Sequence, residues 1–138
     1  MDFPDFDGDG MRRLLDDAER RGGPEAVAAT DHVIQYGVAT LLAAQQAAID
    51  DARASFADLD AARRTRDAAR IAQARDHAVR SYERARGLSR EVDAFLRQML
   101  MQTVSFNRSA LPQLQAAAAA NMASTAELEL LALSQESP

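Results

Sequence analysis

The chain has 138 residues and a formal net charge of −5, and 47% of its residues belong to the hydrophobic set. Thirty of these residues are alanine, which favours helix but buries little apolar surface. The absence of cysteine excludes disulfides, thiolate metal sites and cysteine nucleophiles, and only two histidines are present. We therefore expect a helical, non-enzymatic protein with no cofactor and no small-molecule substrate.

Charge is distributed unevenly along the chain, and every basic residue is an arginine. Four consecutive blocks carry net charges of −3, −4, +4 and −2: residues 1–24, 25–52, 53–97 and 98–138. Acids interleave the arginines of the third block at helical spacing, as in Asp67 with Arg70 and Asp76 with Arg80. This pattern favours a salt-bridged helix surface over an arginine-rich nucleic-acid interface, which remains the less favoured alternative.

The first ten residues contain one proline and two glycines, so we expect no regular structure in them and no signal peptide. Their acids resemble an EF-hand calcium loop, with carboxylates at Asp5, Asp7 and Asp9 and a last ligand at Asp16. We expect no entering helix before this loop, because Pro4 directly precedes Asp5. A disordered acidic tail is the preferred interpretation, and no metal site is predicted.

A short helix is predicted from Met11 to Arg21, followed by a break at Gly22-Gly23-Pro24. Pro24 is expected to begin the next helix, where its missing N–H costs nothing. This break divides the chain into an acidic N-terminal tail with a short helix, residues 1–24, and a helical domain, residues 25–138.

Heptad repeats of apolar residues dominate the centre of the chain. Positions 71, 78, 85, 92, 99 and 106 are all apolar, and a thinner seam follows positions 27, 34, 41 and 48. The spacing predicts two long amphipathic helices, residues 25–60 and 66–107, that pack as a coiled coil. We favour a turn near residues 60–66, capped by Asp60 or Thr65, over one continuous rod.

A third helix is predicted from about Ser109 to Leu133, with Ser109 as its N-cap and Pro112 in its first turn. Its apolar stripe is predicted to comprise six residues: Leu114, Ala118, Met122, Thr125, Leu128 and Ala132. No segment has 18 consecutive apolar residues, so no transmembrane segment is expected. The predicted fold is all-α: long amphipathic helices in an antiparallel coiled-coil-like bundle, with a short N-terminal helix and no strands.

Two stretches of the central region, Ala39–Ile49 and Ala72–Val92, carry a family resemblance. The first is an Ala/Gln-rich helix, and the second has an aromatic-Glu-x-Ala core at Tyr82–Ala85 followed by Leu-Ser-x-Glu at Leu88–Glu91. In these features the chain resembles the phasins, small helical proteins that coat bacterial polyhydroxyalkanoate storage granules. The resemblance covers roughly the central half of the chain and is largely compositional.

The resemblance implies a cytoplasmic, granule-associated coat protein that adsorbs on the hydrophobic polyester and forms homo-oligomers through its helical seams. The expected adsorbing face comprises ten residues of the two long helices: Ile34, Val38, Leu41, Ile49, Phe56, Val92, Phe95, Leu96, Met99 and Phe106. The alternative is a coiled-coil scaffold or a chaperone-type module, which would use the same seams to bind one defined protein partner.

Overall fold

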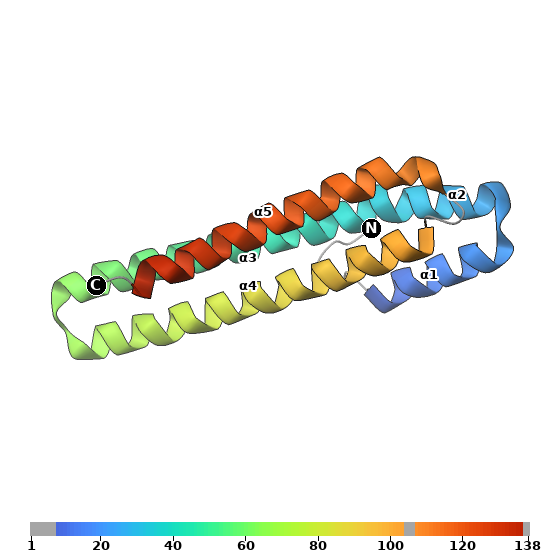
Figure 1. Ribbon diagram of the computed structural model, residues 1–138. Coiled ribbons are helices and arrows are strands. Elements are labelled where there is room, and N and C mark those ends of the chain that lie inside the picture. Colours follow the sequence, from blue (N-terminus) through green and yellow to red (C-terminus); the bar gives the residue numbers. More distant parts are fainter. Residues whose placement is uncertain (1–7, 104–106, 137–138) are drawn as a thin grey trace. The chain divides into compact units, whose positions relative to one another are not determined.

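The computed structural model describes residues 8–103 and 107–136, and within these ranges the chain is helical with no strand (Figure 1). The described residues form five α-helices in chain order: α1 (Gly8–Arg21), α2 (Gly23–His32), α3 (Ala39–Thr65), α4 (Ala68–Thr103) and α5 (Leu111–Glu136). A π-helical segment, η2 (Val33–Val38), joins α2 to α3, and a 3₁₀ turn, η3 (Arg108–Ala110), precedes α5. The predicted all-α class is confirmed.

The first helix begins earlier than predicted. α1 starts at Gly8, whereas the sequence predicted irregular structure up to Gly10. Each glycine costs a helix only about 1 kcal/mol, and burial of Leu15 and Ala18 stabilises the following turns. The predicted break after α1 is confirmed, because Gly22 and Gly23 have φ angles of 69° and 68°, in the left-handed region that favours glycine.

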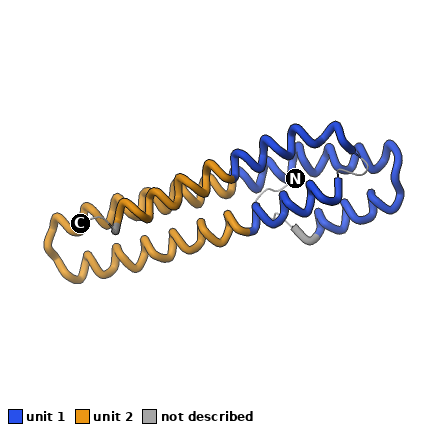
Figure 2. The backbone as a smooth tube through the Cα atoms, viewed as in Figure 1, with its two compact units in different colours: residues 1–43, 91–121 blue, residues 44–90, 122–138 orange. Residues whose placement is uncertain are grey.

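The chain forms two compact units (Figure 2). Unit 1 comprises residues 1–43 and 91–121, and unit 2 comprises residues 44–90 and 122–138. These boundaries differ from the predicted division at residue 24, because α1 packs within unit 1. Its acids Asp16 and Glu19 accept hydrogen bonds from the side-chain amide of Gln102 on α4.

The core of unit 1 consists mainly of large apolar side chains from α1, η2, α3, α4 and α5. The ten largest of them are Leu15, Val33, Ile34, Val38, Leu41, Val92, Phe95, Leu96, Met99 and Leu114. The wider π turn of η2 directs two consecutive residues of each turn inward, since Val33, Ile34, Gly37 and Val38 are all buried. The sequence pattern had not predicted this π segment.

Unit 2 is built from α3, α4 and α5. Gln45 contacts Ser89 and Ser55 contacts Ser81. Since the residue number rises on α3 while it falls on α4, these two helices are antiparallel. Between α3 and α5, the residue numbers of the contacting pairs rise together. Arg53 forms an ion pair with Glu127, and ten residues further along α3, Arg63 donates a hydrogen bond to Gln135. Within this unit, α5 is therefore parallel to α3 and antiparallel to α4.

Small side chains occupy much of the core of unit 2. One cluster joins Ile49 and Ala52 of α3 to Ala85 of α4 and Leu128 of α5. A second cluster consists of Phe56, Leu59 and Ala78, and the Phe56 ring lies 6.4 Å from that of Tyr82 in a tilted arrangement. Alanine at the contact points allows α3 and α4 to approach closely.

A turn separates α3 from α4 close to where it was predicted, after Thr65. Its cap, however, is Asp67 rather than Asp60 or Thr65. The Asp67 carboxylate accepts hydrogen bonds from the backbone N–H groups of Ala69 at 3.0 Å and Arg70 at 3.3 Å, which satisfies two free donors of α4. Arg66 reverses the chain with a φ of 58°, a left-handed conformation without a glycine.

The last helix begins at Leu111, and Pro112 lies in its first turn as predicted. Ser109 is not its N-cap: it lies in η3, where its hydroxyl donates to Asn107 Oδ1 at 2.6 Å. The predicted apolar stripe is wrong at Met122, which is exposed, whereas Asn121 is buried. The buried residues Leu114, Ala117, Asn121 and Leu128 are separated by three, four and seven residues, so the inward face keeps the coiled-coil period.

Candidate functional site

The structure places the predicted adsorbing face inside the molecule. Seven of its residues are buried in unit 1: Ile34, Val38, Leu41, Val92, Phe95, Leu96 and Met99. Ile49 and Phe56 are buried in unit 2, and Phe106 lies outside the described residues. Because these nine side chains are buried within their units, they reach an external surface only when helices separate.

Buried polar side chains line the seam between α3 and α4 in unit 2. Gln45 Nε2 donates to Ser89 Oγ at 2.9 Å, and Ser55 Oγ lies 3.0 Å from Ser81 Oγ. Ser55 also donates its hydroxyl proton to the carbonyl of Asp51, so the Ser81 hydroxyl is the donor of the Ser55–Ser81 bond. Such bonds contribute about 1 kcal/mol each, because the separated helices form equivalent bonds with water.

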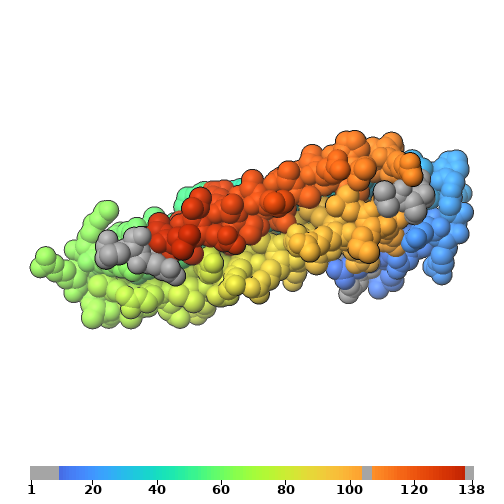
Figure 3. All heavy atoms as spheres, viewed as in Figure 1, coloured from blue at the N-terminus to red at the C-terminus, as the bar shows by residue number. Residues whose placement is uncertain are grey.

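A second apolar surface lies on the outside of α5, where sequence analysis had not predicted one. Met122, Leu130 and Leu133 have exposed fractions of 70%, 66% and 57%. They lie opposite the buried Leu128 around the helix, and this part of α5 is on the surface of unit 2 (Figure 3). Leu130 and Leu133 are three residues apart, which is the spacing of an apolar helix face and the sequence signal of this second surface beside the predicted inward stripe.

The arginines of α4 form exposed ion pairs. Arg80 binds Asp76 at 3.1 Å, as predicted, and Arg84 reaches Asp51 of α3 at 3.8 Å. In place of the predicted Asp67–Arg70 ion pair, the backbone N–H of Arg70 donates a hydrogen bond to the Asp67 carboxylate. Exposed pairs of this kind each contribute at most about 1 kcal/mol, so their main effect is a hydrated surface on α4.

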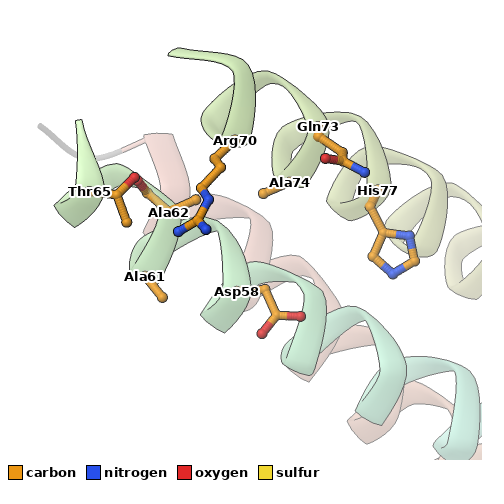
Figure 4. Close-up of a pocket in the computed structure, with 8 residues that line it drawn as sticks. All are labelled: Asp58, Ala61, Ala62, Thr65, Arg70, Gln73, Ala74 and His77. Carbon is orange, nitrogen blue, oxygen red and sulfur yellow. The ribbon is translucent and has the colours of Figure 1, made fainter. Parts of the chain in front are cut away.

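A hollow of about 420 Å³ lies between α3 and α4 in unit 2, next to the turn (Figure 4). Its lining consists of Asp58, Ala61, Ala62 and Thr65 from α3 and Arg70, Gln73, Ala74 and His77 from α4. The Arg70 side chain extends from α4 toward α3 in this view. Asp58, Arg70 and His77 are all exposed, so this is an open, hydrated surface depression.

The EF-hand interpretation of the N-terminal acids conflicts with the part of the loop that the structure describes. From Gly8 onward these residues are helical, and Asp16 accepts a hydrogen bond from Gln102, while Asp5 and Asp7 lie outside the described residues. Across residues 8–103 and 107–136, no three His, Asp or Glu side chains are grouped so that they could hold a metal ion. In the same ranges, every helix is too short or too polar to cross a bilayer.

The fold defines an all-α protein built mainly from long amphipathic helices, with small and polar residues in one seam and an apolar outer face on α5. In comparisons with known proteins, no family model, no curated protein and no solved structure matched this chain. The function is therefore inferred from the chemistry of these surfaces and from the resemblance in residues 39–92.

Proposed function

We propose that the protein is a non-enzymatic amphiphilic coat protein that binds the hydrophobic surface of polyhydroxyalkanoate storage granules in the cytoplasm and associates with itself. The resemblance of residues 39–92 to phasins supports the choice of polyester as the surface. The observation that supports the binding mode is the seam between α3 and α4 in unit 2. Its alanine and serine side chains hold the helices together weakly.

Separation of α3 from α4 uncovers few large apolar groups. The buried large side chains of unit 2 are Ile49, Phe56, Leu59 and Leu128, each worth roughly 1.5–3 kcal/mol when removed from water. A polyester surface offers them an alternative apolar contact, so most of this free energy is recovered on adsorption. The Gln45–Ser89 and Ser55–Ser81 bonds are replaced by bonds to water or to the ester groups.

The outer faces of the same helices suit a hydrated coat. Arg80 with Asp76 and Arg84 with Asp51 keep the surface of α4 charged, and all four side chains are at least half exposed. After α3 and α4 separate and lie on the polymer, these groups face water, as the polar face of an interfacial helix does. The coat would then prevent bare polymer surfaces from coalescing.

A reversible tether between α3 and α4 tests this proposal. The chain has no cysteine, so the double variant Ser55→Cys, Ser81→Cys introduces one unique thiol pair at positions whose hydroxyl oxygens are 3.0 Å apart. Oxidation should close this disulfide, and adsorption on purified polyhydroxyalkanoate granules should then fall at least about tenfold, because α3 and α4 can no longer separate. Addition of reductant should restore binding in the same sample.

The wild-type protein is the matched control, because a chain without cysteine cannot respond to oxidant or reductant through a disulfide. Equal granule binding by the oxidised and reduced variant would show that α3 and α4 do not need to separate. Failure of the wild-type protein to bind polyester at all, while retaining its helical circular dichroism, would refute the coat function itself.

A further inference from the structure

The second half of α5, residues 122–135, belongs to unit 2 and buries fewer side chains than the first half, residues 111–121 (Figure 2). The buried side chains of the first half are Leu114, Ala117 and Asn121. In the second half, Leu128 is the only buried side chain, and the half-buried Leu131 packs against both core clusters of the unit. Little buried apolar area therefore holds the second half in place.

The ion pair and the hydrogen bond that join this half-helix to α3 lie at the surface of unit 2. Glu127 forms the ion pair with Arg53, and the two side chains are 43% and 48% exposed. Gln135 accepts the hydrogen bond from Arg63 at 3.3 Å, also in an exposed position. Water and dissolved ions compete with exposed contacts of this kind, so both stabilise the packed position only slightly.

α3 and α4 are held to each other in more ways. The turn after Thr65 joins them directly. Between them lie two buried side-chain hydrogen bonds and one apolar cluster: Gln45–Ser89, Ser55–Ser81, and Phe56 with Leu59 and Ala78. Residues 122–135 have no direct connection to α4, because residues 91–121 of unit 1 lie between them in the chain. Departure of the half-helix therefore leaves most contacts between α3 and α4 in place.

We propose that residues 122–135, here called the α5 strap, open and close as one segment in solution while α3 and α4 stay paired. Segments with few buried contacts and exposed bonds open at a lower free energy than the rest of a fold. A detached segment of this length is only marginally helical in water, so opening also breaks its backbone hydrogen bonds part of the time.

Opening of the α5 strap uncovers the apolar cluster that Leu128 completes. Ile49 and Ala52 of α3 and Ala85 of α4 belong to that cluster, and all three are fully buried when the strap is closed. The strap therefore controls access to an apolar surface of unit 2 without any break between α3 and α4. In the proposed coat function, this opening would precede the separation of α3 from α4, but it is a property of the free protein and does not depend on polyester.

Amide hydrogen exchange read by mass spectrometry tests the proposal on the wild-type protein in the absence of polyester. Peptides from residues 122–135 should exchange at least about tenfold faster than peptides from residues 47–59 of α3, after correction for intrinsic rates. The exchange rate should be similar along the whole strap, because it opens as one segment. A rate that only rises gradually toward residue 135 would indicate fraying of a helix end and overturn the proposal.

Two leucines of the strap provide a matched pair of variants. Leu128→Ala removes the one buried side chain of the strap and should accelerate exchange across residues 122–135 at least about tenfold, with a much smaller change in residues 47–59. Leu130→Ala, two residues further on, truncates a side chain that is 66% exposed and should change the exchange less than about twofold. Equal effects of the two variants would show that Leu128 does not hold the strap closed.

The Ser55→Cys, Ser81→Cys tether separates this inference from the proposed function. Its disulfide joins α3 to α4 and leaves α5 free, so oxidation should leave exchange in residues 122–135 unchanged within about twofold. If the tether slows the strap tenfold or more, or if the strap and residues 47–59 exchange equally in the wild type, unit 2 opens as a whole and the proposal is overturned. Failure of the wild type to bind polyester would refute the coat function and leave these exchange rates as they are.

Discussion

Units 1 and 2 are built partly from the same helices, yet their cores differ in composition. Among the described residues, unit 1 buries ten large apolar side chains and unit 2 buries four. α4 shows the contrast within one helix. Its buried residues include Ala78, Ser81 and Ala85 in unit 2 but Phe95, Leu96 and Met99 in unit 1. Heptad periodicity therefore sets which side of a helix is buried, while side-chain size sets how firmly that side is held.

The largest expected loss of stability comes from truncating a buried leucine, and one leucine from each unit's core is compared. Leu96→Ala removes a buried side chain of unit 1, whose buried core consists mainly of large apolar residues, and should lower the free energy of unfolding by about 4 kcal/mol because a cavity is left. Leu59→Ala, in unit 2 and also buried, should cost only about 2 kcal/mol, because its neighbour Ala78 is small and α4 can move closer. Urea unfolding followed by circular dichroism measures both values.

Equal losses for the two variants would contradict the comparison of the units. A larger loss for Leu59→Ala would reverse it and remove the basis for a weak α3–α4 seam.

A substitution of intermediate expected effect, Gly37→Ala, tests how closely α1 approaches η2 in unit 1. A Cβ atom at Gly37 would lie 2.4 Å from Met11 Cε and Sδ, so Gly37→Ala must displace the end of the Met11 side chain. We expect thermal unfolding to show a loss of stability of about 1 kcal/mol at most, because Sδ and Cε are the flexible end of the Met11 side chain and can move. Met11→Ala combined with Gly37→Ala should show a favourable coupling of at least about 0.5 kcal/mol, because the clash is then absent.

Gly87→Ala in unit 2 is the matched control. No atom lies within 4 Å of a Cβ built at Gly87, so alanine should stabilise α4 by about 0.5–1 kcal/mol. If Gly37→Ala and Gly87→Ala changed the stability in the same direction, the close approach of Met11 to Gly37 would not have the expected effect.

The smallest effect concerns the turn that joins α3 to α4 in unit 2. Asp67→Ala removes the cap that accepts from Ala69 and Arg70 and should cost about 1 kcal/mol, measured as a lower thermal midpoint. Arg66→Gly in the same turn should instead raise the stability, by less than about 1 kcal/mol, because glycine adopts the φ of 58° without strain. A loss of stability in the Arg66 variant would indicate that the arginine side chain itself stabilises the turn.

The sequence by itself determined the helical class, the break at Gly22-Gly23-Pro24, the inward row of Ala78, Ala85, Val92 and Met99, and a turn close to Thr65. These features depend on local propensity and on periodicity within one helix, which can be read from neighbouring residues alone. The start of α1 and the cap at Asp67 were displaced by a few residues, because helix ends depend on backbone hydrogen bonds that several nearby side chains could supply.

Only the tertiary structure decided which apolar residues are available for binding. The ten residues predicted to adsorb had the right periodicity for an apolar face, and the nine that are described lie in the two cores. Conversely, Met122 was predicted to face inward, yet it is exposed together with Leu130 and Leu133, since Asn121 occupies the inward position. Periodicity shows that a helix has an apolar side, but whether another helix already covers that side depends on packing between segments far apart in the sequence.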